Sequence, residues 1–179
     1  TDLAEKAPSR LPLLEGLKSA LLGEGVSDLL LLGMGGSSLA PLVISRVIGS
    51  ADGFPRLHVL DTTSPVQISS LLETLDRATT YVIISSKSGT TIEPLSLYAI
   101  VQAWLTAEGM PKHEAGRHCI VITDPGSPLE KLRSRELMRT TLSAPATVGG
   151  RYSALSMFGL APAALIGVHM PTMLARAEA

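Results

Sequence analysis

Residues 81–94 read YVIISSKSGTTIEP, and this stretch decides the fold. Its first four residues are an apolar, mostly β-branched run, which is typical of a strand buried on both faces. Apolar residues then recur through residues 93–105 at the spacing of a helix. The turn between them, residues 86–91, carries four hydroxyl side chains, a glycine and Lys87, whose side chain would add a spare cation for a ligand. We expect a strand–turn–helix corner whose backbone N–H groups and helix dipole favour an anion such as phosphate.

The same alternation of short apolar runs and helical patterns fills most of the chain. The expected strands are residues 29–32, 57–60, 81–84, 119–122 and, more briefly, 140–142. Helical patterns cover residues 11–22, 66–75, 93–105, 129–137 and 155–167. Another helix follows residues 39–41 and ends near residue 48, with Pro41 acceptable in its first turn. This alternation predicts an α/β fold with one parallel sheet and helices on both faces.

Two corners of this sheet are rich in glycine or hydroxyl groups, and they follow the first and third strands. Ligands of open parallel sheets bind beyond the carboxyl ends of the strands, where the strand order reverses. A strand order of 2-1-3-4-5 would make the two corners neighbours at that point. We therefore expect this order, with a ligand between residues 33–38 and residues 86–91.

Composition excludes several classes of function. The 179 residues carry a net charge of −1 without a basic cluster, which disfavours nucleic acid and anionic membranes. No apolar run approaches the roughly 18–20 residues of a membrane span, and the first residues lack a signal-peptide profile. The single cysteine, Cys119, lies in an apolar run and is expected to be a core residue. These features predict a cytoplasmic protein.

The glycine turn after the first strand, GMGGSS at residues 33–38, leaves three readings open. It could be a ligand loop, or a tight turn that binds nothing. It could also bind a dinucleotide, with Asp61 after the second strand contacting a ribose. The dinucleotide fingerprint Gly-x-Gly-x-x-Gly would require glycine at Ser38, and it fails there.

The hydroxyl cluster at residues 86–91 also has a simpler interpretation, an elaborate helix cap. A cap needs only one hydroxyl, and four favour an anion. Glu93 could be a catalytic carboxylate, but a first-turn acid that complements the helix dipole is the simpler interpretation. Asp61 and Asp124 each precede a helical pattern and are most simply N-caps. The four histidines show no metal-ligand spacing, and we predict neither a metal nor a cofactor.

The character of the sequence changes after residue 145. Residues 147–153 read TVGGRYS, and a cation beside a flexible glycine pair is not what core packing needs. We divide the chain into a helical lead-in (1–28), a sheet domain (29–145) and a Gly-Gly-Arg loop with the helices after it (146–179). The last residues look like a helix that stops in mid-pattern, so we expect the chain to be a fragment.

Three segments together resemble motifs of the glucose-6-phosphate isomerase family, in the family's order and at about its spacing. They are GMGGSSLAP at residues 33–41, SSKSGTTIE at residues 85–93 and VGGRYSALS at residues 148–156. The segment DPGSPL at residues 124–129 is similar to the divergent bacterial branch, which includes the isomerase half of transaldolase–isomerase fusions. The resemblance covers residues 29–167.

This resemblance implies a sugar-isomerase (SIS) domain, a three-layer sandwich with a five-stranded parallel sheet. It assigns the 6-phosphate of glucose 6-phosphate or fructose 6-phosphate to the phosphate-binding residues Ser86, Lys87 (through its amide), Ser88 and Thr91. Gly36 and Ser37 would line the sugar pocket. Gly150 would allow close approach of the substrate, and Arg151 would stabilise the negative charge of a cis-enediolate.

The chain also departs from the family pattern. Many members have aspartate at the position of Ser38 and glycine at that of Ala40. The family's catalytic glutamate, histidine and lysine belong to a second SIS domain and a C-terminal tail, and Glu93 is no substitute for them. We therefore expect the chain alone to bind phosphate without turnover, and the full-length protein to form a possible homodimer. The alternative function is a stand-alone SIS module that senses a sugar phosphate.

Overall fold

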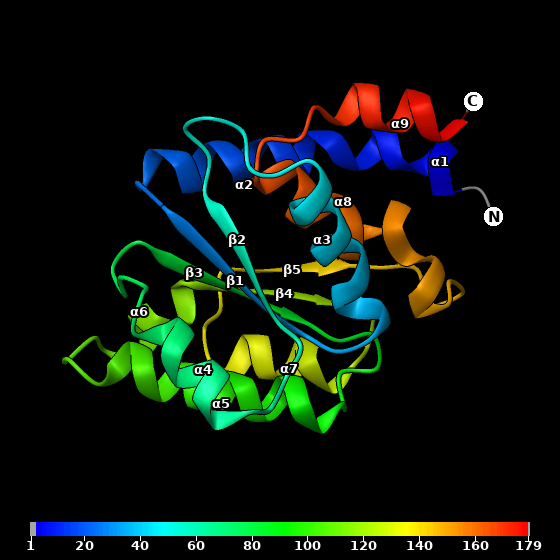
Figure 1. The fold of residues 1–179 in the computed structure, drawn as a ribbon. Coiled ribbons are helices and arrows are strands. Elements are labelled where there is room, and N and C mark those ends of the chain that lie inside the picture. Colours follow the sequence, from blue (N-terminus) through cyan, green and yellow to red (C-terminus); the bar gives the residue numbers. More distant parts are fainter. Residues whose placement is uncertain (1–2, 179) are drawn as a thin grey trace.

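The computed structural model describes residues 3–178, and its centre is a five-stranded parallel sheet (Figure 1). The strands are β1 (Asp28–Gly33), β2 (Arg56–Leu60), β3 (Thr80–Ser85), β4 (Cys119–Thr123) and β5 (Thr140–Ser143). They lie in the order β2-β1-β3-β4-β5, so the predicted order 2-1-3-4-5 is confirmed. In the register of the sheet, Leu31 of β1 stands between Val59 and Ile83, and Ile83 pairs with Ile120.

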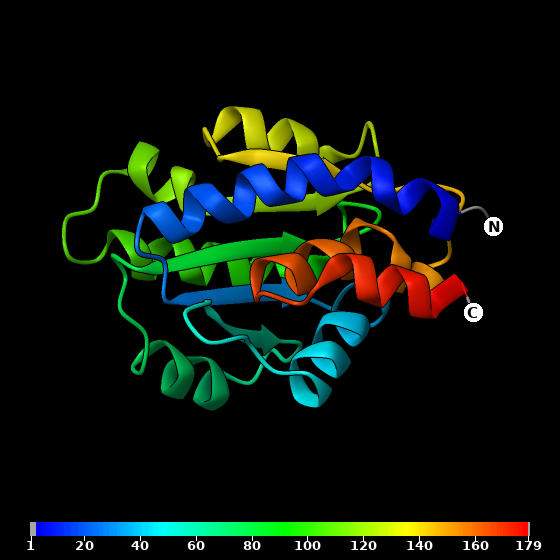
Figure 2. The ribbon, with the colours of Figure 1, turned by 90° about the horizontal axis from the view of Figure 1, so that it is seen from above.

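Alternate residues of each central strand enter two separate apolar cores. Leu29 and Leu31 pack with helices α2 (Leu11–Gly23), α8 (Met157–Leu165) and α9 (Met170–Glu178), and Ile44 of α3 (Gly36–Val47) joins this core. Leu30 and Leu32 pack on the other face, whose four helices are α4 (Pro65–Leu72), α5 (Ile92–Thr106), α6 (Lys112–Arg117) and α7 (Pro128–Arg135). Figures 1 and 2 show these two layers on either side of the sheet.

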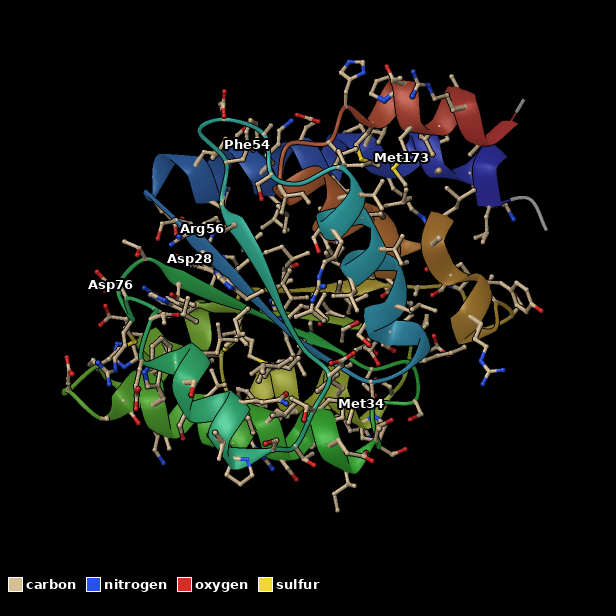
Figure 3. All side chains as sticks on the ribbon, viewed as in Figure 1. Asp28, Met34, Phe54, Arg56, Asp76 and Met173 are labelled. Atoms are coloured by element: carbon tan, nitrogen blue, oxygen red, sulfur yellow. The ribbon has the colours of Figure 1, made fainter. Side chains whose placement is uncertain are left out.

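The three central strands are buried along their whole length, as expected for a sheet covered on both faces. Strand β2 differs because it lies at an edge. Arg56 is exposed, the next three residues are partly exposed, and within this strand only Leu60 is buried. In Figure 3, Asp28 and Arg56 lie close together where the two strands begin, and Met34 lies beyond the opposite end of β1.

Several elements differ from the expected pattern. The short helix α6, the N-terminal helix α1 (Leu3–Lys6) and the 3₁₀ helix η1 (Ala7–Arg10) were not predicted. The helix expected over residues 155–167 is present as α8, and a 3₁₀ helix that was not predicted, η2 (Gly150–Leu155), precedes it. The boundary between them falls at Ser156, whose side chain caps α8 by accepting a hydrogen bond of 3.3 Å from the Phe158 N–H.

The first and last segments of the chain contribute to one core. Helix α8 is buried along its length and contacts α2, α3 and strands β4 and β5, and α9 lies alongside α1 and η1 (Figure 2). The division into 1–28, 29–145 and 146–179 stays a prediction, although its outer segments share the core of the sheet. Across residues 3–178, no helix is both long enough and apolar enough to cross a lipid bilayer.

Candidate functional site

The corner after β1 begins helix α3 earlier than expected. Gly35 takes a positive φ of 56°, and the helix starts at Gly36, so Pro41 lies inside α3 instead of in its first turn. Proline has no N–H to donate to the carbonyl four residues earlier, which belongs to Ser37. That carbonyl instead accepts a hydrogen bond of 2.9 Å from the hydroxyl of Ser85 at the end of β3. The proline thus allows the first and third corners to be joined.

The corner after β3 uses its hydroxyl groups to shape the loop. Ser86 is buried, and its Oγ accepts a 3.2 Å hydrogen bond from the Gly89 N–H. Ser88 Oγ likewise accepts a hydrogen bond from the Thr90 N–H at 3.2 Å. Thr91 holds the N-cap position of α5, yet its side chain accepts no hydrogen bond from the first turn. The helix-cap interpretation of the cluster is therefore wrong, and the first-turn N–H groups of α5 keep no side-chain acceptor.

Backbone donors are available at this corner. Within residues 3–178, the N–H groups of Lys87, Ser88 and Thr91 have no hydrogen-bond acceptor. They lie at the N-terminus of α5, a helix of 15 residues whose dipole places partial positive charge there. Unpaired donors at the positive end of a helix form the arrangement that binds phosphate groups.

The Gly-Gly-Arg segment reaches the same edge of the sheet from the other side. Gly150 lies against Gly36, so close that a side chain on Gly36 would overlap the backbone of Gly150. Ser153 supports the contact, because its Oγ donates to the carbonyl of Gly36 at 3.2 Å. The third predicted motif is thereby fixed beside the first.

A cavity of about 440 Å³ lies where the three segments meet. Among its lining residues are six that the sequence predicts for substrate: Gly36, Ser37, Lys87, Ser88, Thr91 and Gly150. Ser86 is not among them and lies buried beneath the loop. Arg151 lines a neighbouring cavity of about 150 Å³ on the other side of Gly36, together with Asp61. The structure thus brings the predicted residues together, with Arg151 beside the main cavity and not in it.

Two expectations about charged residues are wrong. Asp61 and Asp124 are not N-caps, because Ser64 and Ser127 occupy the N-cap positions of α4 and α7. Asp124 forms an ion pair with Lys87 and also lines the main cavity. The Lys87 side chain is therefore not a spare cation for the ligand.

Sequence reasoning did not predict that Asp124 would line the main cavity, and it considered Asp61 as a ligand contact only for a dinucleotide. A signal was present, since Asp124 follows β4 and Lys87 follows β3, and neighbouring parallel strands end at the same edge. Asp61, which follows β2, reaches that edge by the same rule.

The cysteine and three of the histidines are buried or hydrogen-bonded within the fold, away from the main cavity. Burial raises the pKa of the Cys119 thiol to about 12, as expected for a core residue. His58 bonds to Asp28, His118 to the Thr80 carbonyl and His169 to Thr172. Glu93 lies in the first turn of α5. No group of three or more His, Cys, Asp or Glu side chains within residues 3–178 is arranged to hold a metal ion.

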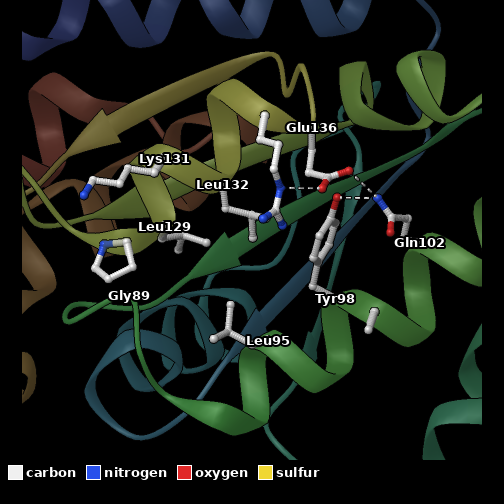
Figure 4. A pocket seen from close by; sticks show the side chains of 11 residues that line it. Gly89, Leu95, Tyr98, Gln102, Leu129, Lys131, Leu132 and Glu136 are labelled. Atoms are coloured by element: carbon white, nitrogen blue, oxygen red, sulfur yellow. Dashed lines mark hydrogen bonds and ion pairs between the residues drawn. The ribbon is translucent and has the colours of Figure 1, made fainter.

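A larger cavity, of about 510 Å³, lies between α5 and α7 (Figure 4). Leu95, Leu129 and Leu132 form its apolar wall. At one end, Gln102 donates hydrogen bonds to Tyr98 and Glu136 at 2.8 and 3.2 Å. Gly89 of the corner after β3 lines this cavity, but none of the residues assigned to the phosphate or the sugar does, and the cavity shares no lining residue with the one at the carboxyl edge.

The fold and the site define a class, a parallel α/β protein of SIS-like architecture with unpaired backbone N–H donors at the carboxyl edge of its sheet. A family model described as phosphoglucose isomerase matches residues 14–178. The chain belongs to this isomerase family.

Individual relatives agree with this assignment. The chain is 39% identical over 150 residues to a glucose-6-phosphate isomerase of Thermus thermophilus, a match that covers 83% of the chain and 35% of that protein. A crystal structure of a hypothetical protein from the same species is 34% identical and has a TM-score of 0.85, with 99% of this chain and 42% of that one covered. Glucose-6-phosphate isomerase of Chlamydia trachomatis is 26% identical, with a TM-score of 0.76 over 92% of this chain and 30% of that one. The chain spans about a third of the length of the curated relatives it matches.

Proposed function

We propose that this chain is the phosphate-binding part of an isomerase that interconverts glucose 6-phosphate and fructose 6-phosphate. The observation that carries the proposal is the 440 Å³ cavity, in which residues from three separate predicted motifs face the same space. Family membership supports the reaction class, and the printed names of the relatives support the substrate.

The phosphate group would lie at the N-terminus of α5. Hydroxyl groups of Ser88 and Thr91 line the cavity there, and the N–H groups of Lys87, Ser88 and Thr91 are unpaired in the described part of the chain. Ser86 would act indirectly, because its buried hydroxyl holds the Gly89 N–H and thus the shape of the loop. Hydrogen bonds from neutral donors to a charged phosphate are stronger than those to a neutral acceptor.

The sugar would then extend across Gly36 and Ser37 toward Gly150 and Arg151. Isomerisation moves a proton between C1 and C2 through a cis-enediolate, and a fixed cation stabilises the charge that develops on its oxygens. Arg151 is exposed and makes no ion pair within residues 3–178, so its guanidinium is available for this role. A general base with a pKa near the working pH must remove the proton, and we place that base outside this chain.

The complete enzyme would be longer than this chain, since the matched relatives are more than twice its length. We infer that the isolated chain binds phosphate esters weakly and does not turn them over. Fusion to a transaldolase and assembly into a homodimer stay predictions.

An NMR titration of this chain with fructose 6-phosphate, and with unphosphorylated fructose as control, tests the proposal. We expect the amides of residues 86–91 to shift at millimolar phosphate ester and not with fructose. Shifts with both sugars, or shifts elsewhere only, would remove the phosphate site from this corner. Measurable isomerase activity in the purified chain would contradict the inference that the base lies elsewhere.

The stand-alone sensor is the competing function, and Arg151 separates the two. A sensor gains little from a cation near the reacting carbons of the sugar. In an enzyme of the relatives' full length, Arg151→Ala should leave phosphate-ester binding within a few-fold and reduce kcat by about 100-fold or more, the size typical of a lost electrostatic stabiliser. Equal losses in binding and turnover would assign Arg151 to ligand binding alone, and a full-length wild-type protein without turnover would favour the sensor.

A further inference from the structure

We propose that the Lys87–Asp124 ion pair is a positioning device that couples the phosphate corner to the Gly-Gly-Arg segment. The inference deepens the proposed function and rests on it for the identity of the ligand. Both residues line the 440 Å³ cavity, and neither is a catalytic residue in this account, because they act through the loops they join.

Lys87 connects three loops through atoms other than its N–H. Its carbonyl accepts hydrogen bonds from the Asp124 N–H at 3.1 Å and from Thr123 Oγ1 at 3.3 Å, which ties the β3 corner to the β4 corner. Its ammonium group pairs with the Asp124 carboxylate and donates to the carbonyl of Ala146 at 2.9 Å. Ala146 lies four residues before Gly150, on the segment that carries Arg151.

The two charges depend on each other. The Lys87 and Asp124 side chains are 28% and 17% exposed, so both are largely removed from water. One carboxylate oxygen of Asp124, Oδ1, is buried and has no hydrogen-bond partner within residues 3–178. Lys87 is therefore the group that compensates the carboxylate, and without it a negative charge would face a cavity built for an anion.

The geometry predicts that substitutions of Lys87 and Asp124 change phosphate affinity differently but affect residues 146–152 in the same way. Lys87→Met removes the cation and leaves the Asp124 carboxylate to repel the ligand, so affinity should fall about tenfold or more. Asp124→Asn frees the ammonium group beside the cavity, so affinity should stay unchanged or rise. Lys87→Met removes the charge-assisted hydrogen bond to Ala146, and Asp124→Asn removes the ion pair that holds the ammonium group beside Ala146, so both should loosen residues 146–152.

Amide hydrogen exchange on this chain, read by NMR, tests the loop effect without any activity measurement. The Val148 and Tyr152 N–H groups bond to the carbonyls of Pro145 and Gly149 at 3.2 and 2.9 Å, so both report on the segment. We expect roughly tenfold faster exchange at these amides in Lys87→Met and in Asp124→Asn, the size of one lost charge-assisted hydrogen bond. The Val82 amide, bonded to the His118 carbonyl in the sheet, should not change.

Controls keep the result interpretable. Lys87→Arg keeps the cation and should keep most of the protection. Glu108→Gln breaks the ion pair with Arg77, far from the cavity, and should leave Val148 and Tyr152 unaffected. In the double variant of Lys87 and Asp124, these amides should exchange no faster than in the faster-exchanging single variant. Both substitutions disrupt the same contact, so their effects should not add.

The outcomes separate the two hypotheses. Unchanged exchange at Val148 and Tyr152 in both single variants would overturn the coupling, as would parallel losses of phosphate affinity in both. Failure of the wild-type chain to bind fructose 6-phosphate would count against the proposed function alone, since the exchange rates of the loop are measured without ligand.

Discussion

Gly36 and Gly150 meet backbone to backbone at the carboxyl edge of the sheet. A Cβ atom on Gly36 would stand 2.6 Å from the carbonyl oxygen of Gly150, well inside van der Waals contact. The reverse is not true, since a Cβ on Gly150 would stand 3.4 Å from the nearest atom of Gly36. The contact is therefore one-sided, and it fixes how closely the Gly-Gly-Arg segment approaches helix α3.

Gly36→Ala should force these two backbones apart. We expect a loss of about 1–3 kcal/mol in the free energy of unfolding, the usual cost of an overlap that packed atoms cannot avoid. Urea denaturation measures it. Gly16→Ala is the matched control, because Gly16 lies inside α2 with open space around it, and alanine there should stabilise by about 0.5–1 kcal/mol. Equal stability of Gly36→Ala and wild type would show that the segment yields without cost.

Gly89→Ala should disrupt the phosphate corner itself. Gly89 has a positive φ of 67°, and a side chain there would meet Ser127 Oγ at 2.9 Å. Gly126 has a similar φ of 75° but open space, so Gly126→Ala costs the backbone strain alone, about 1–2 kcal/mol. We expect Gly89→Ala to cost more than this and to abolish the NMR shifts with fructose 6-phosphate. Retained shifts would mean that the loop shape is not needed for the anion.

Substitutions of Ser86 and Ser88 should have different effects, the first on folding stability and the second on phosphate-ester binding. Ser86→Ala leaves the buried Gly89 N–H without an acceptor and should cost about 1–3 kcal/mol of folding free energy. Ser88 is exposed and lines the cavity, so Ser88→Ala should weaken phosphate-ester binding about threefold to tenfold with little change in stability. Thermal unfolding and calorimetric titration of both variants check the split. If Ser86→Ala weakened binding and Ser88→Ala lowered stability instead, Ser86 would be the ligand contact and Ser88 the residue that supports the loop.

Asp28 should make the fold sensitive to acid. Burial opposes its ionisation, but hydrogen bonds from His58, Ser27 and Arg56 outweigh burial and lower the pKa of the carboxyl below its usual 3.8. A carboxylate with a lowered pKa stabilises the fold above that value, and the contribution is lost as pH falls through the folded-state pKa. Asp28→Asn should therefore cost about 2 kcal/mol at neutral pH, and this difference should shrink below pH 4.

Denaturant titrations from pH 2 to pH 7 measure that difference, with Asp52→Asn as an exposed control. If the difference in unfolding free energy between wild type and Asp28→Asn stays constant over the whole pH range, the loss of stability comes from altered packing or hydrogen bonding and not from the lost charge.

The sheet could be predicted from sequence because its signals are local. Uninterrupted apolar runs such as residues 29–32 and 81–84 are distinctive, and the polar corners after them constrain the strand order. The candidate cavity followed, since corners of adjacent parallel strands end at one edge. Predictions failed where a contact joins distant residues. The local sequence favoured a ligand cation at Lys87 and a helix N-cap at Asp124. Only the pairing of β3 with β4 in the folded sheet brings the two side chains together.

The start of helix α3 was mispredicted for a related reason. A proline normally belongs in a first turn, and Pro41 suggested that the helix begins near it. The structure starts the helix at Gly36, and the carbonyl that Pro41 leaves without a donor is bonded by Ser85 from another strand. No local pattern indicated that a serine 48 positions away would supply that bond.

This exchange of donors yields a double-mutant test. Ser85→Ala should leave the Ser37 carbonyl unpaired in a buried place and cost about 1–3 kcal/mol in the free energy of unfolding. Pro41→Ala restores a helical N–H that can reach the same carbonyl. In the Pro41→Ala background, Ser85→Ala should therefore cost roughly 1 kcal/mol less than in the wild type. Urea titrations of the four proteins give the coupling energy, and a value near zero would show that the two donors do not compete for Ser37.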